Sequence, residues 1–181
     1  EDLSDIDQQL NLWEGRITSN FSVEGVPVTV ETVCHPERDL IAFSVRSELL
    51  ASGRMKVEIR FPFPTAQHTD GAIRFDRTDD HQSIVESETS DLKVIRHLLD
   101  GTAYTISINS EQSTVLDQKD AHYFVLSPEK STDELVASVE FSPEIVPGTI
   151  PLFSESVISS ALAWKSFWQS GGAIDFSGST D

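Results

Sequence analysis

Apolar and polar residues alternate along most of this chain, and this period of two constrains the fold more than any other feature. Residues 21–30 alternate on both sides of the turn Glu24-Gly25, a pattern that predicts a β-hairpin. Apolar positions within 39–46 and 55–61 predict two more strands, the second with one buried and one hydrated face. The first half of the chain should therefore form a sheet with one apolar face.

Four further apolar segments predict strands, and short connections rich in polar residues or glycine separate them; they are 92–99, 104–108, 122–126 and 135–141. Long helices do not alternate with these strands, which weighs against a doubly wound α/β sheet. Many short strands joined by turns are typical of an antiparallel β-sandwich. A mostly β fold of this kind is the expectation.

Three polar segments interrupt the alternation and are not expected to form strands. They are the acidic residues 1–12, the long segment 62–89 and the stretch 109–120. Loops as long as 62–89 are usually functional or contribute to an interface. This segment is therefore the first place to look for a site.

One helix is expected near the C-terminus, after the prolines and glycine between 143 and 151. Ser154 can cap it, Glu155 lies near its positive N-terminal end, and Gly171-Gly172 ends it. Its apolar stripe has to be covered by the sandwich or by another domain. The stripe consists of Val157, Ile158, Ala161, Trp164, Phe167 and Trp168.

Composition excludes several partners. The 181 residues carry 13 Lys and Arg against 30 Asp and Glu, a formal net charge of -17, so neither nucleic acid nor an anionic membrane surface is an expected partner. The length fits one sizeable domain. The single cysteine, Cys34, rules out an internal disulfide and a four-thiolate zinc site.

Motifs for catalysis are absent from the sequence. It contains no helical HExxH pair, no nucleophile between glycines and no phosphate-binding glycine loop, and no acidic pair stands out for glycoside hydrolysis. His68, Asp70, Asp80 and His81 share one loop and come nearest to a metal-ligand set. A solvated or docked loop is the favoured interpretation. We therefore expect no metal and no cofactor.

Exposed aromatic rings offer a route to sugar binding, because the C–H face of a sugar suits the face of Trp or Tyr. Trp13 and Tyr104 are the candidates, although a Trp in a β-sandwich more often belongs to the core. Both remain candidate carbohydrate-binding residues.

Several segments together resemble a known family. They are Asn11–Gly15 and 164–179 near the two ends, Val33–Ala42 in the middle, and His68-Thr69-Asp70 with Asp80-His81-Gln82 in the long loop. This pattern is similar to the N-terminal region of bacterial six-hairpin glycosidases related to the glycoside hydrolase family 65 type. In that family a galactose mutarotase-like β-supersandwich precedes an (α/α)6 barrel.

The resemblance implies an antiparallel β-supersandwich over residues 1–150, with 151–181 forming a linker helix and the start of the connection to a catalytic barrel. The general acid of the family is a glutamate on that barrel, so no catalytic residue can be assigned to this chain. The chain alone is then expected to be inactive, although its parent is a glycoside hydrolase. A secreted or periplasmic parent is favoured over a cytoplasmic one.

The resemblance also suggests roles for side chains. Trp164, Phe167 and Trp168 would pack between domains, against the barrel of the same polypeptide. His68, Asp70 and His81 would belong to a loop beside the cleft for the carbohydrate substrate.

Two other functions remain open at this point. One is a free-standing carbohydrate-binding module that uses Trp13 or Tyr104. The other is an epimerase of the mutarotase kind, which needs an acid and a base on one concave face. His35, His97 and His122 are the histidines on expected strands, and no partner carboxylate can be named for them.

Overall fold

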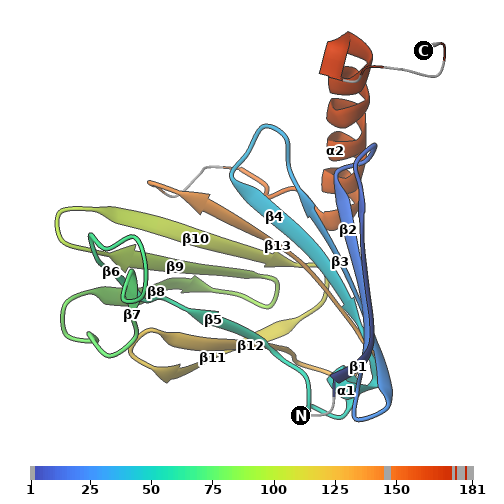
Figure 1. Cartoon of the computed structure of the whole chain (residues 1–181). Coiled ribbons are helices and arrows are strands. Elements are labelled where there is room, and N and C mark those ends of the chain that lie inside the picture. Colours follow the sequence, from blue (N-terminus) through green and yellow to red (C-terminus); the bar gives the residue numbers. More distant parts are fainter. Residues whose placement is uncertain (1–2, 145–147, 173, 175–177, 179–181) are drawn as a thin grey trace.

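The computed structural model describes residues 3–144, 148–172, 174 and 178. Most of these residues form antiparallel strands, and a helix lies near the C-terminus, which confirms the expected fold class. A large sheet and a small sheet converge at one side of the molecule and open like a wedge at the other (Figure 1). None of the described helices is long and apolar enough to cross a membrane.

The large sheet has eight strands. In spatial order they are β1 (Leu3–Asn11), β2 (Arg16–Val23), β3 (Val26–Cys34), β4 (Leu40–Arg46), β13 (Glu134–Ser142), β10 (Ala103–Ser110), β9 (Leu92–Leu98) and β8 (Gln82–Glu88). The small sheet has the order β11 (Thr114–Asp120), β12 (Tyr123–Pro128) and β5 (Val57–Arg60). The other elements are the short pair β6 (Phe63–Pro64) and β7 (Ile73–Arg74), α1 (Glu48–Ala51), α2 (Phe153–Phe167) and one π-helical turn, Trp168–Gly172.

The predicted hairpin is confirmed as β2 and β3. Its turn residues Glu24 and Gly25 both have positive φ, 51° and 78°, as the tightest hairpin turns require. Besides the two-residue strands β6 and β7, three longer strands, β1, β8 and β11, lie where the sequence predicted none. Each is at the edge of its sheet, and each has an irregular register with its neighbour. A bulge shifts the side-chain alternation, so these strands do not show a regular period of two.

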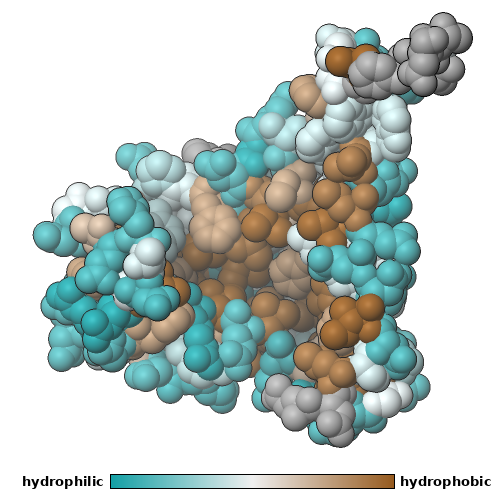
Figure 2. All heavy atoms as spheres, in the orientation of Figure 1, coloured by the Kyte–Doolittle hydropathy of each residue, from teal (hydrophilic) through white to brown (hydrophobic). Residues whose placement is uncertain are grey.

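The core lies between the two sheets. Its largest cluster joins β9, β10 and β13 of the large sheet to β12 of the small one, with Ile95, Ile108, Phe124 and Leu126 all fully buried. Burial of side chains of this size contributes about 1.5–3 kcal/mol each. Figure 2 shows hydrophobic atoms filling the hollow between the sheets.

The small sheet covers only part of the large sheet's inner face. Ile41 pairs with Val139, and Phe141 pairs with Ile106, so both point toward the side that the core occupies. Nevertheless Ile17, Ile41 and Phe141 remain 36%, 41% and 40% exposed. An apolar strip of the inner face beside β2, β4 and β13 is thus open in this chain.

The first half of α2 packs on the outer face of the large sheet. Phe153 and Val157 contact the cluster of Val33, Leu40 and Ala42. The small side chains of Ser156 and Ser160 are 0% and 2% exposed, which lets the helix approach the strands closely. Figure 1 shows the second half of α2 projecting beyond the sheet.

The expected helix cap is wrong. Leu152 is the N-cap, and Ser154 lies exposed within the first turn. Glu155 Oε2 accepts a hydrogen bond from the Leu152 amide at 2.8 Å, and Glu111 Oε1 accepts one from the Phe153 amide at 3.2 Å. These two carboxylates bind amides that a capping side chain would otherwise satisfy, so the helix begins before Ser154.

One buried ion pair fastens the segment before α2 to the large sheet. Arg38 Nε and Nη2 donate to the two carboxylate oxygens of Glu140 at 2.6 and 2.7 Å, and Arg38 Nη1 donates to the Thr149 carbonyl at 3.0 Å. The Glu140 side chain is 6% exposed and that of Arg38 is 26% exposed. The loss of either partner therefore has unequal consequences.

We predict that Arg38→Met lowers the free energy of unfolding by about 3 kcal/mol, because it leaves the Glu140 carboxylate buried without a partner. Glu140→Gln should cost only about 1–2 kcal/mol, since the more exposed Arg38 can be hydrated. Urea denaturation measures both. Arg54→Met, which breaks the exposed pair of Arg54 with Glu24, is the control and should cost less than about 0.5 kcal/mol. Equal losses for all three variants would contradict this.

Candidate functional site

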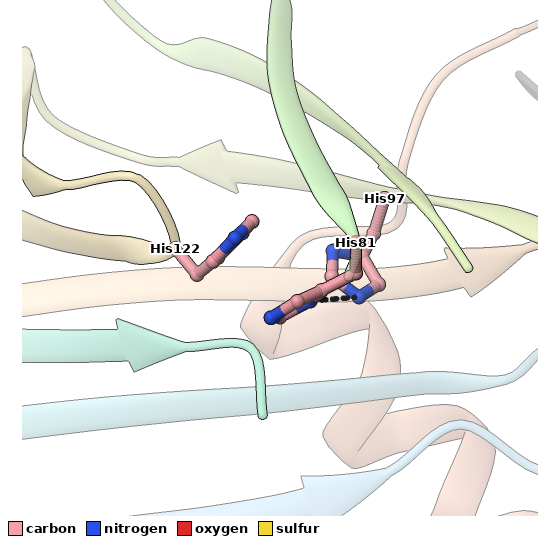
Figure 3. A group of neighbouring side chains, drawn as sticks. All are labelled: His81, His97 and His122. Atoms are coloured by element: carbon pink, nitrogen blue, oxygen red, sulfur yellow. Dashed lines mark hydrogen bonds between the residues drawn. The ribbon is translucent and has the colours of Figure 1, made fainter. Parts of the chain in front are cut away.

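Three histidines that are far apart in the sequence meet in the core. His81 directly precedes β8, His97 lies in β9 and His122 directly precedes β12. They are 6%, 0% and 8% exposed, and one ring nitrogen of each lies within 4.8 Å of the others. Figure 3 shows the three rings gathered between the sheets. We call this group the histidine cluster.

Hydrogen bonds connect the histidine cluster in one chain. The Thr78 carbonyl can only accept, so His122 Nε2, at 2.9 Å, donates to it. With neutral rings, Ser83 Oγ then donates to His122 Nδ1 and accepts from His97 Nδ1, both at 2.9 Å. His97 Nε2 is left to accept from His81 Nδ1 at 3.3 Å. This order of donors and acceptors assigns one tautomer to each ring.

Aromatic rings surround His97. Phe61 stacks on it with ring centroids 4.7 Å apart, and the Tyr104 ring lies at 5.2 Å. Burial, together with the nearby His81 and His122, lowers the pKa of His97 to about 4. Burial also lowers the pKa of His81, with a further contribution from His122. At neutral pH both rings are therefore uncharged, and each has one nitrogen without a proton.

The histidine cluster has the chemistry of a ligand set or of a proton relay, rather than that of an acid and base pair. Among the described residues, no carboxylate oxygen forms a hydrogen bond to any of the three rings. No residue spacing in the sequence points to the cluster, because its members belong to separate elements. The one hint was that His97 continues the alternation of Lys93 and Ile95 on the inward face of β9.

The loop residues proposed from the sequence are only partly brought together. His68 and Asp70 are exposed between β6 and β7. Arg77 pairs with Asp80 at 2.5 Å and stacks over the Phe63 ring at 4.1 Å. His81 alone among the loop candidates enters the histidine cluster, so this loop does not form the ligand set that its sequence suggested.

A second region joins the two ends of the chain. Trp13 comes from the turn between β1 and β2, and its ring centroid lies 5.7 Å from that of Trp168. The Trp168 ring stacks on the Trp164 ring with centroids 5.6 Å apart, and the Phe167 centroid is also 5.6 Å from that of Trp164. We call these four residues the aromatic junction. The two end segments that resemble the glycosidase family therefore meet in space.

Hydrogen bonds and a close backbone approach hold the aromatic junction. Trp168 Nε1 donates to the Leu12 carbonyl at 2.6 Å, and Ser160 Oγ donates to the Glu14 carbonyl at 2.9 Å. Gly15 has φ of 64°, and a Cβ there would overlap the Trp164 indole and come within 2.8 Å of Ser160 Oγ. Only glycine fits this approach of the hairpin to the helix.

The two candidate sugar-binding rings lie in different places. Trp13 belongs to the aromatic junction and is 64% exposed. Tyr104 is half-buried beside Phe61 and His97, and burial raises its pKa. No single stacking platform unites them in the described part of the chain.

Apolar side chains of α2 from Ile158 onward remain without cover. Ile158 and Leu162 are 62% and 64% exposed, and Phe167 is 51% exposed. Trp164 and Phe167 also line an apolar hollow of about 330 Å³, together with Cys34, His35, Pro36, Ser160 and Ala163. Apolar surface of this kind usually marks a contact with another protein surface.

The fold of this chain is similar to that of a solved structure, although its sequence matches no known family. No protein-family model matches the chain, and no curated protein sequence matches it. Among solved structures, the chain is similar to a protein described as a kojibiose phosphorylase from the human microbiome, with a TM-score of 0.53 and 9% identity. The match covers 93% of this chain and 25% of that one, so the chain spans about a quarter of that protein's length.

We predict that Gly15→Ala separates the hairpin from α2, at a cost of about 1–3 kcal/mol from steric overlap and the positive φ. All three tryptophans of the chain lie in the aromatic junction, so the Trp fluorescence should shift to the red while far-UV circular dichroism stays unchanged. Gly25→Ala is the matched control, because its φ is also positive but no atom lies within 4 Å. An identical spectrum for both variants would count against this contact.

We also predict that acid weakens the fold through His97. An unfolded histidine binds a proton near pH 6.5, whereas folded His97 stays neutral down to a pKa of about 4. The unfolded state therefore binds more protons in this interval, so stability falls as the pH drops from 6.5 to 4, by up to ~3 kcal/mol. Urea unfolding at pH 7 and pH 4.5, with a chelator present, measures the loss. His97→Gln should lose less on acidification than the native chain, and His68→Gln, an exposed control, should lose the same amount.

Proposed function

We propose that this chain is a non-catalytic accessory domain of a larger enzyme that acts on glycosidic bonds. The observation that carries the proposal is the uncovered apolar surface of Ile158, Leu162 and Phe167 on α2, a helix whose Phe153 and Val157 are packed on the sheet. A helix with apolar residues on two sides is suited to lie between two domains. The proposed partner is the catalytic barrel of the same polypeptide.

The structural comparison supports this proposal. A chain that aligns with a quarter of a sugar phosphorylase has the size of one domain of such an enzyme. The family resemblance of the sequence, to glycosidases related to family 65, points to the same class. Because the similar protein is described as a phosphorylase, the parent reaction is either hydrolysis or phosphorolysis of a glycosidic bond.

The domain limits follow from the same interpretation. Residues 1–150 would form the β-supersandwich, and 151–181 would form the linker helix and the connection to the barrel. Trp164, Phe167 and Trp168 would pack at the interface, and the open strip of Ile17, Ile41 and Phe141 offers a second surface for contact. The exposed loop with His68 and Asp70 would approach the sugar cleft.

The test compares this chain with a form extended through the proposed catalytic barrel, which we call the long form. We expect the long form to cleave aryl glycosides or disaccharides, with or without phosphate, and the chain of 181 residues to be inactive. Ile158→Glu and Leu162→Glu should lower the melting temperature of the long form by several degrees, because each places a charge in an apolar interface. The same variants should leave the melting temperature of the short chain within about one degree, since both side chains are exposed there.

Ser166→Glu, at an exposed polar position of the same helix, is the matched control and should change neither form. Equal activity of the short and long forms would overturn the accessory role. Sugar binding by the short chain that is lost in Trp13→Ala would favour a carbohydrate-binding module instead.

A further inference from the structure

We propose that the histidine cluster binds one divalent transition-metal ion, with zinc as the best fit, through one ring nitrogen each of His81, His97 and His122. The three nitrogens already lie within 4.8 Å of one another (Figure 3). His81 Nδ1 and His97 Nε2 are 3.3 Å apart. Two ligands of a tetrahedral zinc ion, each about 2.0–2.1 Å from the metal, are separated by about that distance.

In the assigned tautomers the lone pairs of His97 and His122 are on nitrogens inside the cluster, and a bound metal would replace the hydrogen bonds that these lone pairs now accept from His81 Nδ1 and Ser83 Oγ. His97 Nδ1 donates to Ser83 Oγ, which keeps the lone pair of His97 on Nε2, facing His81. His122 Nε2 donates to the Thr78 carbonyl, which keeps its lone pair on Nδ1. Metal-binding histidines typically donate their second nitrogen to a carbonyl or another oxygen in this way. Binding of the metal would replace the proton that His81 Nδ1 shares with His97.

One ring has to turn for all three to bind. The His81 and His122 rings are stacked, with centroids 3.6 Å apart and planes 18° apart, so their in-plane lone pairs do not meet at one point. His81 lies in a bend and His122 in a turn, each directly before a strand, where a side-chain rotation needs no change in the sheet. His97, held between Phe61 and Tyr104, is the fixed member of the site.

A metal ion can reach the histidine cluster from solvent. His81 and His122 line a surface hollow of about 300 Å³ together with Thr78, Gln82, Ser83, Ile84, Gln118 and Ala121. The net charge of -17 raises the concentration of cations around the chain. Three protein ligands leave one tetrahedral position, which water from the hollow can fill.

The ligand type selects the metal. Neutral imidazoles suit zinc, copper, nickel and cobalt, whereas calcium and magnesium prefer oxygen ligands. No carboxylate among the described residues forms a hydrogen bond to the cluster that would place an oxygen ligand there. The site should therefore discriminate strongly against calcium and magnesium.

The test uses the chain without a histidine tag. One equivalent of ZnCl2 should raise its melting temperature by several degrees, while MgCl2 and CaCl2 should not. Calorimetric titration should give one site per chain. Cobalt(II) should produce visible absorption bands of a tetrahedral complex, a signal that a purely structural cluster cannot generate.

Variants locate the site. The variants His81→Asn and His122→Asn should fold, because both positions lie outside the strands. Each variant removes one ligand and should weaken zinc binding by about 100-fold. Ser83→Ala should weaken it about tenfold, because Ser83 orients the His97 ring. The double variant His35→Ala, His68→Ala removes the two histidines outside the cluster, one half-buried and one exposed, and should bind like the native chain.

Two results would overturn the proposal. The first is a native chain with neither a zinc-dependent rise in melting temperature nor a cobalt spectrum. The second is zinc binding that survives in His81→Asn but disappears in the His35 and His68 double variant, which would show adventitious binding at the surface. Both results are independent of the proposed accessory role, since neither involves the glycosidic activity of the longer polypeptide.

Discussion

The need to cover one wide apolar face governs this structure. The large sheet presents hydrophobic residues along its inner side, and removal of that surface from water is the main favourable contribution to folding. The small sheet is too narrow to cover all of it, so Ile17, Ile41 and Phe141 stay partly exposed. The wedge shape, the deep core and the open strip are consequences of this mismatch between a sheet of eight strands and one of three.

The outer face is organised around α2 and the contacts that hold it. Arg38 and Glu140 fix the segment that leads into the helix, and the hairpin turn at Gly15 supports its second half. Because the helix is anchored at two places, its exposed residues Ile158 and Leu162 are presented on a rigid element. A rigid apolar surface loses little conformational entropy when a partner covers it, which is why we regard this face as an interface within a longer protein.

The histidine cluster places three polar rings in a buried part of the molecule, where each polar group needs a hydrogen-bond partner. Buried imidazoles need hydrogen-bond partners, and the chain from Thr78 through Ser83 supplies them to all three rings without any charged group. Such a neutral network is compatible with a stable core. It also leaves each ring with one unprotonated nitrogen, in a cluster that borders a surface hollow. The same arrangement therefore accounts for the fold and for a metal-binding capacity.

The sequence by itself determined the antiparallel β architecture, the Glu24-Gly25 hairpin and the C-terminal helix, because central strands and an amphipathic helix impose a regular period on neighbouring residues. It did not reveal β1, β8 and β11, since an edge strand with a bulge keeps neither regular alternation nor two buried faces. The cap at Leu152 was missed because Glu111, from a distant loop, helps to set the start of the helix. Tertiary structure alone decided that Trp13 meets Trp168 and that His81, His97 and His122 share one site, because proximity between separate elements depends on strand order and sheet packing, which no local spacing encodes.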